Sequence, residues 1–286
     1  MASKSSVEYY SNIKEMSPIR AIAETLMNNH LVRKVDIREA YELAIKQPGV
    51  SVTDLPMYPE FVKLHNLPKD AKIINDCHGN IIGRTAKARR FYNRVNPSLK
   101  NKLESDFREA VWQMQHYQLI KAEAILGMDK DLMLKATFIT TESDAANLYF
   151  WLLNFAPYES LAQEYEASPK LPIQDIILVA FNEWTCNDSY YNNVGAPQLA
   201  LVDEKHNVMV NLGMRYFGER KKGTLTLAWT SGIRIGMAAC HGGIKEIDFG
   251  TCENPEYHKL GKRSIAFYGC LLYTSDAADD LLRVYL

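Results

Sequence analysis

The chain reads RYFGERKKG from Arg215 to Gly223, and His241 follows the second lysine of this stretch by nineteen residues. Arg220, Lys221 and Lys222 are adjacent cations, and each raises the electrostatic potential at its neighbours, so that a lysine loses its proton more easily. A neutral amine can bind a divalent metal beside an imidazole, while a lysine that stays charged can hold a carboxylate or a phosphate. The stretch therefore indicates a site for a metal ion and an anion, in a chain whose later part we expect to be α/β.

The same stretch is also typical of a solvated turn, because runs of charged residues usually face water. Two classes of protein therefore stay open: an enzyme, or a non-catalytic α/β domain whose basic loop holds an anion. A P-loop and an acidic metal ligand further along the chain would indicate the enzyme.

The sequence from about Leu132 to Gly269 resembles the N-terminal half of ATP-dependent phosphoenolpyruvate carboxykinase. In that family a segment Tyr-Gly-Gly-Glu-Met-Lys-Lys-Gly precedes the metal-binding histidine by the same nineteen residues. The matching residues here are Tyr216, Gly218, Glu219, Lys221, Lys222, Gly223 and His241. Weaker matches run in the same order: Thr137–Thr140 and Val208–Val210 resemble family strands, and Ser264–Gly269 is similar to the strand that ends on the first glycine of the phosphate-binding loop.

The resemblance implies an α/β fold with a substrate-binding domain over residues 1–235 and the truncated start of a P-loop nucleotide-binding domain over 236–269. It implies conversion of oxaloacetate and ATP to phosphoenolpyruvate and carbon dioxide, a lyase reaction of gluconeogenesis. The implied cofactors are Mn²⁺ at the site and Mg²⁺ with ATP.

The resemblance also assigns roles. Lys222 and His241 would bind Mn²⁺, Lys221 would stabilise the enolate, and Tyr216 would contact the substrate or carbon dioxide. Lys222 would also contact the substrate, and Gly269 would belong to the nucleotide site. Cations and a metal suit this reaction because an enolate and a transferring phosphoryl group are both anionic.

A second candidate segment is Gly83–Lys87, which resembles the family's Gly-Arg-Ser-Pro-Lys. Its arginine, Arg84, would bind a substrate carboxylate, since the guanidinium fork matches two carboxylate oxygens. Ala86 stands in place of the family's proline, and Ala88 in place of an acidic residue. A surface arginine is the alternative.

Two departures lie beside the main motif. Phe217 stands where the family has glycine, and Gly242–Gly243 follow the histidine where it has Cys-Ser. They leave open a phosphoryl-transfer enzyme of the same fold that acts on another small acid.

The match ends at Gly269. The next residues, Cys270–Leu286, lack the glycines and lysine that a P-loop needs to surround phosphates, and they resemble a translated sequencing adapter. A natural helix over Asp276–Leu286 is the alternative. Because the P-loop would lie beyond Gly269, we expect the chain to be inactive by itself.

Composition is typical of a packed globular protein, with 47% hydrophobic and 23% charged residues. A net charge of −1 gives no overall field for nucleic acid or an anionic membrane, so neither is an expected partner. No apolar run of signal-peptide length occurs in Met1–Tyr10, and the five cysteines show no CxxC spacing. We therefore expect a cytoplasmic protein with reduced thiols.

Caps and periodicity predict a mostly helical first hundred residues and a mixed remainder. The predicted helices begin at Ser17, Asp36, Pro97 and Ser143 and end near Asn29, Gln47, His116 and Asn154. The predicted strands are 175–181, 198–202, 207–212 and 224–229, with a hairpin turn at 203–206.

Deletion of Cys270–Leu286 should leave the melting temperature nearly unchanged, because residues that did not evolve with this core should pack poorly against it. Differential scanning calorimetry of the full and shortened chains checks this. A large loss of stability would show that the tail is native.

Overall fold

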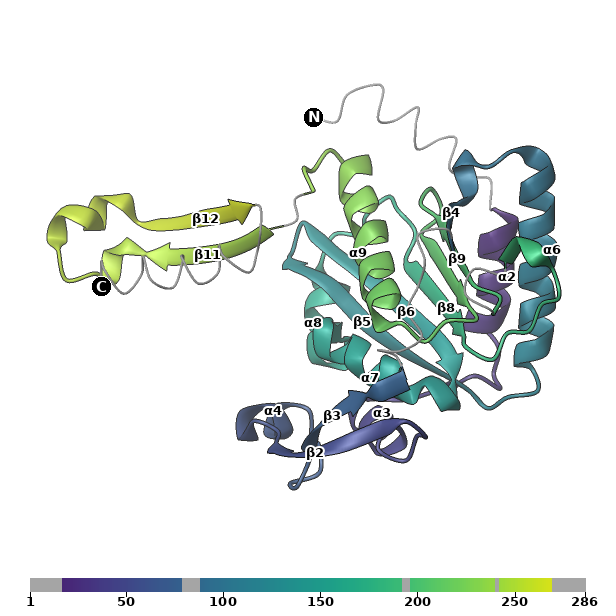
Figure 1. The fold of residues 1–286 in the computed structure, drawn as a ribbon. Helices are drawn as coiled ribbons and strands as arrows, with labels where there is room; N and C mark the ends of the chain where they lie inside the picture. The colour runs from purple at the N-terminus through teal and green to yellow at the C-terminus, as the bar shows by residue number, and fades with distance from the viewer. Residues whose placement is uncertain (1–16, 79–87, 192–195, 240–241, 269–286) are drawn as a thin grey trace. The chain divides into compact units, whose positions relative to one another are not determined.

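The computed structural model describes residues 17–78, 88–191, 196–239 and 242–268, and the chain divides into two compact units, Met1–Gly236 and Met237–Leu286. The first unit is a mixed sheet with helices on both faces (Figure 1). The predicted α/β class is confirmed. No helix within the described residues has the length and apolar composition needed to cross a bilayer.

The sheet of the first unit has the strand order β1-β5-β6-β8-β10-β9-β4, and β7 pairs with β5. Parallel pairing joins β6 to β8, β8 to β10, β4 to β9 and β1 to β5, while β5–β6, β9–β10 and β5–β7 are antiparallel. The strands are β1 (Arg33–Lys34), β4 (Arg89–Phe91), β5 (Leu119–Asp129), β6 (Leu132–Thr141), β7 (Ala156–Pro157), β8 (Ile176–Phe181), β9 (Leu199–Asp203) and β10 (Val208–Leu212). Because β6, β8 and β10 are parallel, their carboxyl ends meet at one edge.

Two hydrophobic cores cover the faces of this sheet. One core includes Met209 of β10 and residues of α3, α7 and α9, and the other includes Val208 and Val210 with residues of α2 and α6. Alternate residues of β10 therefore point to opposite faces, as the period of a strand requires. The helices are α2 (Pro18–Met27), α3 (Ile37–Ala44), α6 (Pro97–Met114), α7 (Ala145–Asn154), α8 (Tyr158–Ala167) and α9 (Phe217–Arg234).

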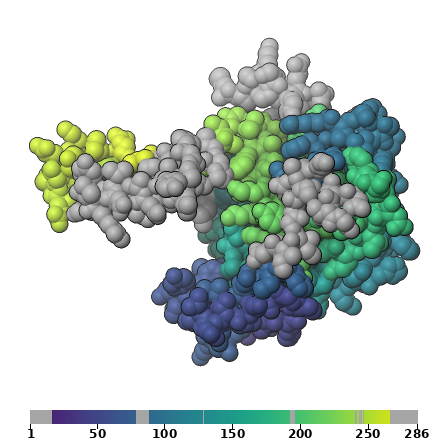
Figure 2. Space-filling model, in the orientation of Figure 1, coloured from purple at the N-terminus to yellow at the C-terminus, as the bar shows by residue number. Residues whose placement is uncertain are grey.

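The chain after α3 forms a small lobe within the first unit. It contains the antiparallel strands β2 (Val50–Pro56) and β3 (Lys72–Asp76), with helix α4 (Pro59–Leu64) between them. Neither β2 nor α4 has a buried residue, and the space-filling view shows the lobe at the edge of the unit (Figure 2). The prediction of a mostly helical first hundred residues missed this hairpin.

The side-chain caps confirm three predicted helix starts. Ser17 accepts a hydrogen bond from the Arg20 amide at 3.0 Å, and Asp36 accepts one from the Glu39 amide at 2.8 Å. Asn96 likewise caps α6. Each cap satisfies an amide that the first helical turn leaves without a partner.

The predicted start of α7 at Ser143 was wrong. The helix begins at Ala145, and the Ala146 amide donates to the Gln47 side chain at 2.8 Å. Gln47, which lies three residues after the end of α3 and 99 positions earlier in the chain, thus supplies the cap. A pattern of residues close together in the sequence cannot predict a contact between residues this far apart.

The predicted strand over residues 224–229 was also wrong, because these residues belong to α9. Alternation of Thr and Leu in this segment is typical of a strand. The buried positions of α9 include Arg220, Gly223, Thr224, Leu227 and Ser231, which recur at helical spacing. Tertiary packing of this face decides the structure.

The second unit contains an antiparallel pair, β11 (Gly242–Asp248) and β12 (Lys262–Tyr268), in which Asp248 pairs with Lys262. The predicted strand over Ser264–Tyr268 is therefore present and pairs with β11. Two 3-10 helices, Phe249–Thr251 and Pro255–Leu260, lie between the strands in sequence.

The predicted hairpin between β9 and β10 is confirmed, and Asp203 is buried at its turn. Its carboxylate lies 2.9 Å from Nδ1 of His206 and accepts from Asn93 at 3.0 Å. Burial opposes ionisation of Asp203, but its hydrogen bonds to His206, Ser17 and Asn93 hold its pKa below the ordinary value. Asn207 closes the turn with a φ of 55°, a conformation that asparagine tolerates.

We expect Asp203→Asn to lower the free energy of unfolding by about 1–3 kcal/mol at pH 7, because it weakens charge-assisted hydrogen bonds in a buried site. The folded pKa of Asp203 is depressed, so its ionised form stabilises the fold above the unfolded pKa of about 4, and this contribution is lost as pH falls through the folded pKa. Urea unfolding at pH 7 and at about pH 3 measures both effects. Asp131→Asn, in an exposed turn, is the control.

Candidate active site

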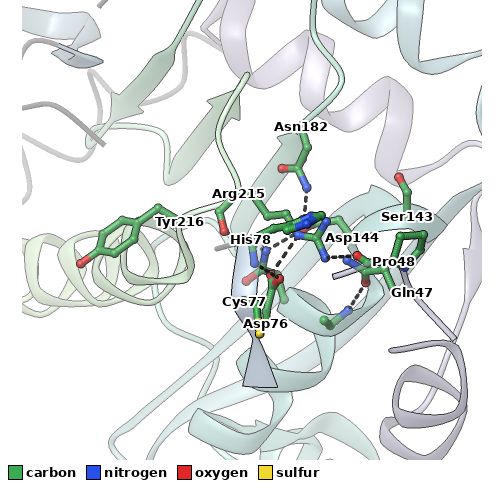
Figure 3. Close-up of polar contacts among 12 residues, drawn as sticks. Gln47, Pro48, Asp76, Cys77, His78, Ser143, Asp144, Asn182, Arg215 and Tyr216 are labelled. Carbon is green, nitrogen blue, oxygen red and sulfur yellow. Dashed lines mark hydrogen bonds and ion pairs between the residues drawn. The ribbon is translucent and has the colours of Figure 1, made fainter. Parts of the chain in front are cut away.

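Polar side chains gather at the carboxyl ends of β6 and β8, beside the loop that joins β10 to α9 (Figure 3). Asp144 follows β6, and Asn182 follows β8 directly. Ligands of α/β proteins usually bind at this edge of a parallel sheet. The loop and the start of α9 are therefore the candidate active site.

Gly213 lets the chain leave β10 sharply. Its φ is 66°, and a Cβ atom at this position would lie 1.9 Å from the carbonyl oxygen of Pro197. The Gly213 amide donates to the Phe181 carbonyl at 2.8 Å. Glycine is the residue that fits both the backbone conformation and the close approach.

Two buried side chains hold the carbonyl groups of this loop. The Arg220 guanidinium donates to the Met214 carbonyl at 2.9 Å and to the Tyr216 carbonyl at 3.3 Å. Asn147 donates to the carbonyl of Arg215 at 3.3 Å. The backbone before α9 is therefore fixed from inside the protein.

Arg220 itself is fully buried and forms an ion pair with Asp144, also fully buried, at 3.0 Å. The same carboxylate accepts from Thr140 at 3.1 Å, from Asn147 at 2.6 Å and from Asn182 at 2.7 Å. A buried ion pair requires such additional hydrogen bonds to offset desolvation. The sequence argument placed Arg220 in one cationic cluster with the lysines, whereas the structure places it in the core.

The glycines of the motif have structural reasons. A Cβ atom on Gly218 would lie 2.6 Å from the ring of Tyr216, so the glycine lets this ring pack over the backbone. A Cβ atom on Gly223 would lie 2.9 Å from Cε of Met209, so α9 packs closely on β10. Glu219 is buried and pairs with Arg89 of β4 at 2.6 Å.

The functional candidates of the motif lie closer to solvent. Tyr216 is 39% exposed, Lys222 is exposed, and Lys221 is half-buried. Successive helical residues are about 100° apart, so Lys222 points away from the face that Arg220 and Gly223 bury. The two lysines therefore point in different directions from the same turn of α9.

Arg215 joins the loop to the lobe. Its Nε donates to Oδ2 of Asp76 at 2.9 Å, and its Nη2 donates to the Pro48 carbonyl at 3.2 Å. Figure 3 shows the Tyr216 ring pointing away from this contact. Arg215 therefore contacts the lobe, whereas the next residue, Tyr216, is exposed to solvent.

Three predicted site residues, Arg84, His241 and Gly269, lie outside the described residues. Around Arg84, the chain is described up to His78 and again from Ala88. Within the described parts, no group of three or more His, Cys, Asp or Glu side chains could hold a metal ion. The roles of these residues stay predictions.

Sequence reasoning missed the polar residues that support the motif, namely Asp76, Asp144, Asn147 and Asn182. A signal existed for Asn182, because it directly follows the apolar run of β8. The other three are recognised only through the residues that they contact.

No family model and no curated protein matches the chain.

Gly213→Ala should lower the free energy of unfolding by about 2–4 kcal/mol, because the new methyl group would collide with a backbone carbonyl in addition to straining φ. Gly236→Ala is the matched control: its φ is 85° and nothing lies within 4 Å of its Cβ position. The control should lose only about 1 kcal/mol. Urea unfolding measures both, and equal losses would show that the loop yields to the methyl group.

Proposed function

We propose that the chain is the N-terminal part of a divergent ATP-dependent phosphoenolpyruvate carboxykinase. The observation that carries the proposal is the position of the motif: Tyr216 to Lys222 begin a helix at the carboxyl edge of the sheet, and Gly218 makes room for the Tyr216 ring. Residues 1–235 would form the substrate-binding domain, and residues 236–269 would begin the nucleotide-binding domain.

In the proposed reaction oxaloacetate loses carbon dioxide, and the enolate oxygen that remains attacks the γ-phosphorus of ATP, which releases ADP. Lys221 would stabilise the enolate, and Tyr216 would contact the substrate or carbon dioxide. Arg84 would hold a carboxylate. Mn²⁺ bound by Lys222 and His241 would supply positive charge beside the developing anion.

Exposure of Lys222 is compatible with its proposed role, because an amine that binds a shared ion has to leave the core. His241 lies outside the described residues, so its part in binding the ion stays a prediction.

Contacts of Phe217 show what this departure from the family does in the fold. Its ring packs edge-on against Phe150 of α7, with the ring centroids 5.7 Å apart, and it joins the core on that face. The residue that departs from the family's glycine therefore packs against another helix. It gives no reason to expect a different substrate.

We expect Lys222→Met to weaken Mn²⁺ binding about tenfold or more, since it removes a ligand and keeps the aliphatic stem. Electron paramagnetic resonance of free Mn²⁺ measures the affinity. Lys170→Met is the control, because Lys170 pairs with Glu166 on the surface of α8. Equal affinity in Lys222→Met and the unaltered chain contradicts the metal role.

The natural sequence after Gly269 tests the enzyme class. A P-loop followed by an acidic metal ligand supports the carboxykinase, and an assay of phosphoenolpyruvate formation from oxaloacetate and ATP by the restored protein decides the substrate. Absence of both features supports a non-catalytic anion-binding domain.

A further inference from the structure

An apolar groove lies on the first unit, apart from the candidate active site. It has a volume of about 650 Å³ and is bordered by α4, the end of α7, the start of α8 and the part of β5 near Gly127 (Figure 1). The groove is open to solvent, since Leu64 of α4 is 72% exposed and Leu153 of α7 is 37% exposed. Pockets of this size hold small organic molecules.

The walls of the groove are mainly aliphatic and aromatic. Phe61 of α4 and Phe155, the C-cap of α7, contribute rings, and the buried side chains of Leu126 and Leu152 lie among the lining residues. Such walls favour a ligand with an apolar body, because contact removes apolar surface of both partners from water.

Three polar side chains also line the groove, and one of them is available to a ligand. The Asn154 amide donates to the Phe150 carbonyl at 2.8 Å, and the Ser160 hydroxyl donates to the Pro157 carbonyl at 2.7 Å. The third is His65, whose ring packs on that of Phe61 with the centroids 4.3 Å apart. Within the described parts of the chain, no hydrogen bond engages the His65 ring, so its N–H can donate to a bound molecule.

Charge complementarity indicates which polar group the ligand carries. Among the described residues no Asp, Glu, Lys or Arg side chain lines the groove, so His65 is its one ionisable group. A cationic ligand would lose water there without gaining a counter-charge, whereas an anion can accept from the imidazole N–H. Burial lowers the pKa of His65, and a bound anion would oppose this effect, because an opposite charge favours the protonated ring.

We propose that the groove binds a small acidic amphiphile, whose apolar body lies against Phe61 and Leu64 and whose anionic group accepts a hydrogen bond from His65. This binding site does not depend on the proposed function, because no described residue between Gly213 and Gly223 lines the groove.

Two fluorescent dyes with the same aromatic body test the ligand class on the full chain at pH 7. Anilinonaphthalenesulfonate carries an anionic group, and N-phenylnaphthylamine lacks it. We expect the sulfonate to bind about tenfold more tightly, because its anionic group gains a charge-assisted hydrogen bond. His65→Phe keeps a ring beside Phe61 and removes the N–H, so it should abolish this preference. Fluorescence titration measures both affinities.

A matched pair of leucines tests the location. Leu64 lines the groove and Leu31 lies outside it, and each is 72% exposed. Leu64→Ala should weaken the binding of both dyes about threefold or more, because it removes apolar contact. Leu31→Ala should change neither affinity. Because both side chains are exposed, both variants should fold, and thermal unfolding followed by circular dichroism checks this.

Each result decides part of the proposal. Equal affinity for the two dyes, or an unchanged preference in His65→Phe, overturns the acidic ligand. Dye affinities in Leu64→Ala that match those in Leu31→Ala overturn the groove as the site. If neither dye binds, the proposal fails, and sedimentation velocity then shows whether a second copy of the chain covers the groove. None of these results bears on Mn²⁺ binding by Lys222, so the proposed function stands or falls separately.

Discussion

The buried ion pair between Arg220 and Asp144 is the interaction on which the candidate site depends. Two charges without solvent are tolerable because Thr140, Asn147 and Asn182 fill the remaining positions around the carboxylate. These groups come from the ends of two parallel strands and from two helices. One network therefore joins the sheet edge to α7 and α9 and leaves the outer side of the loop free for other contacts.

The backbone conformation of the loop between β10 and α9 depends on this network. Arg220 donates to two loop carbonyls, so the backbone around Tyr216 is determined before any ligand binds. The proposed role of this site in stabilising developing charge would require such preorganisation. Removal of Arg220 alone would leave Asp144 as an unpaired buried charge, so the pair serves the fold first and the site through it.

Sequence patterns predicted those parts of the fold that depend on neighbours in the chain. The caps at Ser17 and Asp36 and the turn at Asp203 are local, and each is present. The strand predicted over residues 224–229 was wrong because the pattern there has the period of a strand. In the structure this segment is part of α9, and the Trp151 indole of α7 donates to Thr224 at 3.0 Å. Tertiary contacts overrode the local preference.

The supporting half of the site could not be predicted for the same reason. Arg215 and Asp76 are 139 positions apart in the sequence, and Gln47 and Ala146 are 99 apart. The spacing of residues within a local sequence motif carries no information about such distant pairs. The motif itself was visible, because its charges and glycines are adjacent.

The structure divides this motif into two sets. Gly218, Glu219, Arg220 and Gly223 have identified structural tasks, since each is buried against, or makes room for, a named neighbour. Tyr216 and the two lysines are more exposed. Substitutions in the first set would disturb the fold, so a function proposed for the motif has to be tested at the second set.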